Sequence, residues 1–134
     1  MTHTYLPSML DQGWGRIVTI VSDAGRQGER GQAVYGAAKA AAMGFMRGIA
    51  QEGGRKGVTA NCIALGTIGF EAGDREAGAG EASEENKALI RPYPVGRIGT
   101  PEDPAPLAVL LCSDAAEWIT GQVYPVNGGY TSTL

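Results

Sequence analysis

Apolar residues gather in three short segments that predict β-strands. Arg16–Ser22 and Val58–Leu65 carry apolar residues on both faces, which is typical of strands buried in a parallel sheet. Gly121–Val126 predicts a third strand. Pro125 near its end favours a position at the edge of the sheet, because proline cannot donate a hydrogen bond to a neighbouring strand.

Segments with a helical pattern lie before and between these strands. Ala33–Glu52 is rich in alanine and is followed by two glycines, so it predicts a long helix with a smooth surface. Thr4–Gln12 predicts the end of another helix, which Gly13 terminates. The alternation of strands and helices indicates an α/β fold, in which right-handed crossovers connect parallel strands.

A further helix is predicted from Thr100 to about Cys112. Thr100 is a suitable N-cap, and Pro101 suits the first helical position because the N–H that proline lacks would be unpaired there. Pro104 and Pro106 each remove a backbone donor close to the first turn. We therefore expect a distorted or 3-10 opening.

Length and composition indicate one globular domain. The chain has 134 residues, of which 43% are hydrophobic and 19% are charged, which suffices for one modest core. The net charge of −3 argues against a nucleic-acid partner, and no apolar run approaches the length of a membrane span. Cys62 and Cys112 both lie in apolar runs and are predicted to be buried free thiols of a cytoplasmic protein. No metal site is predicted.

An acidic segment at residues 71–90 differs from the rest of the chain. Positions 71–87 hold six acidic and two basic side chains among many glycines and alanines. This composition predicts a mobile, solvated loop. The alternative is a lid over a pocket, because long loops in compact domains are often functional.

Ser22, Tyr35 and Lys39 are the candidate catalytic residues. Tyr35 and Lys39 are four residues apart near the start of a predicted helix, so they share one face. An ammonium beside a tyrosine favours the phenolate and lowers the pKa of the phenol, which makes a tyrosine usable as a general acid or base. Ser22 ends the preceding strand, where catalytic groups gather in α/β sheets. We expect Ser22 to hydrogen-bond to a carbonyl or hydroxyl oxygen that Tyr35 protonates or deprotonates.

The Tyr35–Lys39 pair alone is a weak signal. The chain has five tyrosines, and at ordinary lysine usage a Tyr-x-x-x-Lys pattern arises by chance in roughly a quarter of such chains. A tyrosine on a helix is more often a half-buried packing residue whose hydroxyl reaches water. The strand end at Ser22 and the small residues that flank Lys39 strengthen the catalytic interpretation.

Five segments occur here in an order that is typical of a known family. They are GRIVTIVSDAG, GQAVYGAAKAAAMGF, GVTANCIALGTI, PVGRIGTPEDPA and ITGQVYPVNGGY. Over residues 5–130 the chain resembles the carboxyl-terminal half of a short-chain dehydrogenase/reductase. Reductases of the 3-oxoacyl-carrier-protein type and hydroxyacyl-CoA dehydrogenases are the most similar in character. The resemblance implies part of a Rossmann-type, doubly wound parallel sheet, with about three strands and flanking helices.

The resemblance also implies roles for five residues. Ser22 would polarise the substrate oxygen, Tyr35 would act as acid and base, and Lys39 would bind the nicotinamide ribose. Gly66 and Ile68 would lie along the nicotinamide of NAD or NADP. Tyr35 and Lys39 would also bind this cofactor. The substrate would be a small ketone or secondary alcohol, or an acyl thioester, and the acidic segment would form the variable substrate loop.

Three departures from the family pattern concern the cofactor. Leu65 stands where the family usually has proline, and Phe70 stands where a threonine often contacts the cofactor. A glycine-rich strand–turn–helix pattern for the pyrophosphate is not found. We therefore expect residues 1–134 to be a single partial Rossmann-like domain that lacks the amino-terminal dinucleotide-binding half, with an incomplete cofactor site.

Two functions are compatible with these observations. The first is NAD(P)-dependent oxidoreduction by a truncated chain, or by one that works with a separate amino-terminal piece. The second is a non-catalytic fragment that serves as an oligomerisation or folding module through the helix Ala33–Glu52. The strand at Ile17–Val21 would lose a neighbour and expose an apolar edge. The chain is therefore expected to form a homo-oligomer, or to pair with the missing half, rather than to remain a stable monomer.

Overall fold

The computed structural model describes residues 1–69 and 84–132. Two short 3-10 turns lie at Gly54–Lys56 and Asp114–Ala116. The architecture is α/β, as the sequence predicts. In chain order the helices and strands are α1 (Thr2–Gln12), β1 (Gly15–Ser22), α2 (Ala24–Gln27), α3 (Ala33–Gly53), β2 (Val58–Leu65), α4 (Glu84–Ile90), α5 (Ala105–Leu111) and β3 (Val123–Val126).

The three strands form one parallel sheet in the order β1-β2-β3. β2 pairs with β1 along its whole length and with β3 over its last four residues. Val58–Ala64 of this central strand are buried, because helices cover both faces of the sheet. β3 lies at an edge, which confirms the prediction from Pro125. β1 lies at the opposite edge of the described sheet, and its Ile20 is 46% exposed.

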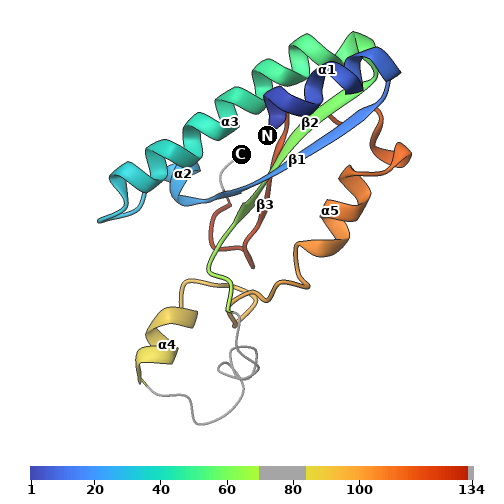
Figure 1. Cartoon of the computed structure of the whole chain (residues 1–134). Coiled ribbons are helices and arrows are strands. Elements are labelled where there is room, and N and C mark those ends of the chain that lie inside the picture. The colour runs from blue at the N-terminus through green and yellow to red at the C-terminus, as the bar shows by residue number, and fades with distance from the viewer. Residues whose placement is uncertain (70–83, 133–134) are drawn as a thin grey trace.

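α1 and α3 lie on one face of the sheet and α5 lies on the other (Figure 1), and each face carries an apolar cluster. On the face that α1 and α3 cover, Met43, Met46 and Ile49 of α3 pack on alternate residues of β1 and β2. On the other face, Leu111 of α5 packs against Ile63. The exposed side of α3 carries small residues and also Phe45, which is half-exposed.

Turn chemistry explains where the elements begin and end. Gly13 ends α1 in the left-handed conformation, with φ 70°, and its N–H returns to the Leu10 carbonyl oxygen, a conformation that favours glycine. The third strand begins at Val123 rather than at Gly121, because Gly121 has φ 71° and cannot belong to an extended strand.

The helix predicted from Thr100 begins five residues later than expected. Residues 101–104 form turns, and α5 starts at Ala105. Asp103 precedes Pro104, which disfavours the helical conformation at Asp103 and delays the start of the helix. The Asp103 carboxylate accepts the Thr100 N–H at 2.8 Å instead, so the prediction of a distorted opening is confirmed and the position of the helix start was wrong.

The two cysteines differ in environment. Both are free; Cys62 is buried in β2, whereas Cys112 at the end of α5 is exposed. The prediction that both are buried is therefore wrong for Cys112, which follows the last apolar contact of α5 at Leu111. Burial raises the pKa of the Cys62 thiol, so this cysteine stays neutral.

Part of the acidic segment is helical. Residues 84–90 form α4, which lies beyond the carboxyl ends of the strands and away from the helices that cover the sheet (Figure 1). Residues 70–83, including Phe70, lie outside the described residues. The expected mobility of this segment stays a prediction. Within the described ranges, no helix combines the length and apolar character that crossing a bilayer requires.

Candidate functional site

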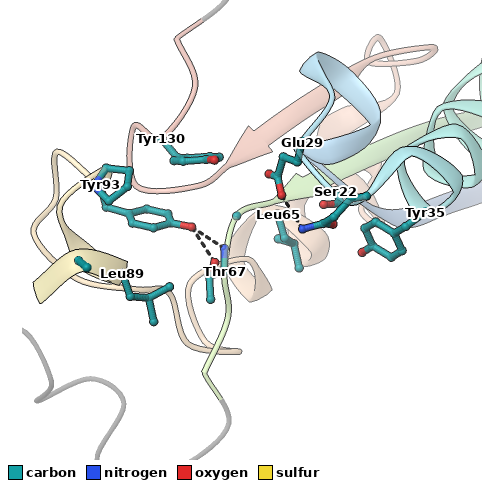
Figure 2. A pocket seen from close by; sticks show the side chains of 12 residues that line it. Ser22, Glu29, Tyr35, Leu65, Thr67, Leu89, Tyr93 and Tyr130 are labelled. Atoms are coloured by element: carbon teal, nitrogen blue, oxygen red, sulfur yellow. Dashed lines mark hydrogen bonds between the residues drawn. The ribbon is translucent and has the colours of Figure 1, made fainter. Parts of the chain in front are cut away.

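A pocket of about 330 Å³ lies at the carboxyl ends of the strands, a volume within the range of small-molecule sites. We call it the strand-end pocket. Figure 2 shows two walls, one from the β1–α3 part of the chain and one that carries two tyrosines. Its lining residues are Ser22, Glu29, Gln32, Tyr35, Leu65, Gly66, Thr67, Ala88, Leu89, Pro92, Tyr93 and Tyr130.

Ser22 is the last residue of β1, so the end of the strand positions its side chain in the pocket wall. Its hydroxyl oxygen accepts the Ala24 N–H at 3.2 Å. A hydroxyl retains its own O–H donor when its oxygen accepts a hydrogen bond. Ser22 can therefore still donate to an oxygen atom in the pocket.

Tyr35 and Lys39 occupy the first turns of α3. Tyr35 lines the pocket and is 48% exposed. The Lys39 ammonium nitrogen lies 5.5 Å from the centroid of the Tyr35 ring and donates to the Ile20 carbonyl oxygen at 3.4 Å. The structure thus brings Ser22 and Tyr35 to one pocket and Lys39 to the side of Tyr35, outside the pocket lining.

Two glycines allow this part of α3 to approach α2. A Cβ atom on Gly36 would lie 2.7 Å from the Ala24 carbonyl oxygen. A Cβ atom on Gly25 would lie 2.8 Å from the Ala40 backbone nitrogen. Both distances are too short for a side chain, so the close packing of α2 on α3 depends on glycine at each position.

Gly66 and Ile68 separate in the structure. Gly66 lines the strand-end pocket, whereas Ile68 lines an adjacent cavity. The backbone of this loop pairs with Gly99, whose N–H donates to the Thr67 carbonyl oxygen at 2.9 Å. The loop after β2 is therefore held in place along its own backbone.

The second wall was not predicted from the sequence. The Tyr93 hydroxyl donates to Thr67 Oγ1 at 2.8 Å and accepts the Thr67 N–H at 2.9 Å. The rings of Tyr93 and Tyr130 stack, with centroids 5.1 Å apart (Figure 2). Burial raises the pKa of the Tyr130 phenol, and the charge of Glu29 raises it further. Tyr130 is therefore a neutral hydroxyl at neutral pH.

A buried carboxylate holds the segment that carries Tyr130. Asp23, which directly follows β1, is fully buried. Its oxygens accept Asn127 Nδ2 at 2.5 Å, Arg26 Nη1 at 2.9 Å and Thr131 Oγ1 at 3.3 Å. The network joins the end of β1 to the chain after β3. A signal for it exists in the sequence, since an acidic residue directly follows an apolar strand.

No cluster of three or more histidine, cysteine or acidic side chains that would hold a metal ion occurs in residues 1–69 and 84–132. The polar side chains that line the strand-end pocket are hydroxyls, the Gln32 amide and the Glu29 carboxylate, and the Lys39 ammonium lies beside Tyr35.

Parallel strands with helices on both faces define an α/β protein, and the strand-end pocket lies where such folds bind ligands. The sequence profile of a family described as enoyl-(acyl carrier protein) reductase matches residues 1–131. The chain belongs to this family of short-chain dehydrogenases/reductases.

Among curated relatives, an acetoacetyl-CoA reductase from Shinella zoogloeoides is 44% identical over 129 residues, which is 96% of this chain and 52% of the relative. A 3-oxoacyl-acyl-carrier-protein reductase from Pseudomonas aeruginosa is 37% identical and covers 96% of this chain and 50% of its own length. The chain thus spans about half the length of the curated relatives it matches.

Solved structures agree with the fold. A candidate NAD(P)-dependent gluconate 5-dehydrogenase from Beutenbergia cavernae, with NADP bound at low occupancy, superposes with a TM-score of 0.83 at 39% identity. It matches over 96% of this chain and 51% of its own. A short-chain type dehydrogenase/reductase from Mycobacterium ulcerans gives the same TM-score at 33% identity, over 96% of this chain and 46% of its own.

Proposed function

We propose that the protein containing this chain is an NAD(P)-dependent oxidoreductase that interconverts a ketone and a secondary alcohol. The observation that carries the proposal is the placement of Ser22 and Tyr35 in one pocket, with the Lys39 ammonium beside the Tyr35 ring. The membership of the family and the names of the relatives support the reaction class. The relatives differ in substrate, from acyl thioesters to gluconate, so they support no narrower class.

In the direction of reduction, Ser22 donates a hydrogen bond to the carbonyl oxygen and Tyr35 gives that oxygen a proton. The positive charge of Lys39 stabilises the phenolate that remains on Tyr35. In the direction of oxidation, the same phenolate accepts the proton of the alcohol. A bound nicotinamide supplies or accepts the hydride in this chemistry.

The described residues fit the nicotinamide-ribose part of the cofactor. An ammonium carries three N–H donors, and the hydrogen bond from Lys39 to the Ile20 carbonyl oxygen, at 3.4 Å, uses one of them. Lys39 and the Tyr35 hydroxyl would hold the ribose. The backbone at Gly66 and Ile68 would face the nicotinamide amide.

Tyr35→Phe tests this function in the whole protein. Removing the phenol should lower turnover of NAD(P)H with a carbonyl substrate by about 10²- to 10⁴-fold, the usual contribution of a general acid. The far-ultraviolet circular dichroism spectrum should not change, because Tyr35 is half-exposed. Tyr5→Phe, an exposed position on α1, is the matched control and should keep the rate.

A Tyr35→Phe protein with a near-normal rate would contradict the assignment of Tyr35. The alternative role, an oligomerisation or folding module, also stays a prediction. It differs in this test, because such a role would not depend on the Tyr35 hydroxyl.

A further inference from the structure

Glu29 lines the strand-end pocket and has no part in the proposed proton transfer. It lies in the connection between α2 and α3 and is half-buried. Figure 2 shows it in the same wall as Ser22 and Tyr35. Among the described residues that line the pocket, Glu29 is the one with a formal charge.

The Glu29 carboxylate is held in position and still has room for a ligand. Its Oε2 accepts the side-chain amide of Gln32 at 2.7 Å. An ionised carboxylate offers about four acceptor positions, so further donors can bind. The charge also reaches the opposite wall, since it contributes to the raised pKa of Tyr130.

The other lining groups suit a polar ligand. Gln32, Tyr35 and Tyr130 bring hydrogen-bonding side chains into the lining, and Ser22 adds a hydroxyl at the strand end. The stacked rings of Tyr93 and Tyr130 add a flat apolar surface. A carboxylate in a partly desolvated pocket attracts hydroxyl donors and repels a second anion.

We propose that Glu29 makes the pocket selective for an uncharged, polyhydroxylated substrate, an alditol or its ketose, in preference to an anionic sugar acid or an acyl thioester. Glu29 accepts a hydrogen bond from a substrate hydroxyl, while Ser22 and Tyr35 bind the carbonyl or alcohol oxygen that reacts. This inference rests on the proposed function and narrows its substrate class.

The test compares Glu29→Gln with the unaltered whole protein on a panel of four substrates. These are a six-carbon alditol with its ketose, the aldonate of the same length, a six-carbon 2-ketone without hydroxyls, and acetoacetyl-CoA. We expect the unaltered protein to prefer the alditol–ketose pair. Glu29→Gln should lower kcat/KM for that pair about tenfold, because a charge-assisted hydrogen bond becomes a neutral one. The loss should fall mainly on KM, and the rate with the hydroxyl-free ketone should not change.

The anionic substrate gives a second readout. Removing the charge of Glu29 should raise the relative kcat/KM for the aldonate several-fold, since the repulsion between the Glu29 carboxylate and the aldonate carboxylate is lost. Glu117→Gln makes the same change in net charge at an exposed position away from the pocket, so it is the matched control. This control should alter neither kcat/KM for the alditol–ketose pair nor the relative kcat/KM for the aldonate. Binding of the alditol and the aldonate by calorimetry measures the same selectivity without turnover.

The outcomes separate the two proposals. Suppose that Tyr35→Phe abolishes turnover, but Glu29→Gln changes neither kcat/KM for the alditol–ketose pair nor the relative kcat/KM for the aldonate. The role of Glu29 is then overturned and the proposed function stands. A preference of the unaltered protein for acetoacetyl-CoA, the simple ketone or the aldonate also overturns it. If Tyr35→Phe retains turnover, the proposed function fails, and calorimetry with Glu29→Gln still decides the role of Glu29. Equal binding of the alditol by both proteins would then reject it.

Discussion

The two ends of β1 each carry an arginine–aspartate ion pair, but in opposite surroundings. At the amino end, Arg16 and Asp114 lie 3.3 Å apart, and the Asp114 side chain is 84% exposed. At the carboxyl end, Arg26 and Asp23 lie 2.9 Å apart, and the Asp23 side chain is 1% exposed. Each aspartate or its network connects β1 to a segment about a hundred residues away along the chain.

The buried ion pair at the carboxyl end of β1 supports the strand-end pocket, whereas the pair at the amino end does not. At the amino end the Arg16 side chain is only 5% exposed, but the Asp114 carboxylate that it contacts faces water, so a solvated aspartate ties the 3-10 turn at Asp114–Ala116 to the base of the sheet. The buried pair adds Asn127 and Thr131, and it lies beneath the segment that carries Tyr130 to the pocket. A buried charge is costly unless it is fully paired, so the carboxyl-end network fixes one position for that segment.

Replacing the aspartate by alanine should therefore change the free energy of unfolding much more at the carboxyl end of β1 than at the amino end. This is the largest effect that we expect. Asp23→Ala leaves Arg26 and the buried Asn127 amide without the carboxylate, which should lower the free energy of unfolding by about 3–5 kcal/mol. Asp114→Ala removes a solvated carboxylate that Arg16 and Trp14 Nε1 contact, and should lower this free energy by only about 1 kcal/mol, because water can reach the groups left behind at this surface. Urea unfolding of the two variants measures both. Equal losses would show that burial does not distinguish the two pairs.

A smaller effect should follow from the hydroxyl of Tyr93. Tyr93→Phe removes two hydrogen bonds to Thr67 but keeps the ring that stacks on Tyr130. Since Thr67 is exposed and water can replace the lost partner, we expect a loss of about 1 kcal/mol in the free energy of unfolding.

Tyr93→Leu also removes the ring stack and should cost a further ~0.5–1.5 kcal/mol. The same urea titration compares the two variants. A Phe variant as unstable as the Leu variant would assign the whole effect to the hydroxyl and none to the stack.

The sequence predicts the β1–α3 wall because its residues are local. Ser22 ends an apolar strand, and Tyr35 and Lys39 follow within one helical face, so strand and helix geometry alone bring them together. The same local patterns predict three parallel strands and the helix at Ala33, which the structure confirms with shifts of one or two residues at most ends.

The tyrosine wall could not be predicted in this way. Tyr93 and Tyr130 are distant in sequence, and their segments meet through tertiary contacts such as the Val95 N–H that donates to the Gly128 carbonyl oxygen at 3.1 Å, so no periodic pattern predicts them. The late start of α5 has a different cause. Its capping residues are suitable, but Pro104, which follows them, prevents the helix from starting there. The effect of this proline on the backbone is stronger than the capping preference.

The smallest effect concerns the Tyr130 phenol, and it reports whether the carboxyl end remains buried in solution. Its pKa is raised in the folded protein by burial, and next by the charge of Glu29. The folded state therefore holds this proton more tightly than the unfolded state, whose tyrosine pKa is about 10. Stability from this group is fully present below pH ~10 and is lost as the pH rises through the folded pKa.

Tyr130→Phe should remove that part of the alkaline loss of stability and leave the neutral-pH value within about 1 kcal/mol. Urea unfolding at a series of alkaline pH values, compared between the two proteins, measures it. Glu29→Gln should make the alkaline loss smaller, because without that charge the pKa of Tyr130 in the folded protein lies closer to its unfolded value. Identical profiles for all three proteins would mean that water reaches the Tyr130 hydroxyl freely. The carboxyl end of β1 would then be no more protected at Tyr130 than the amino end is at Asp114.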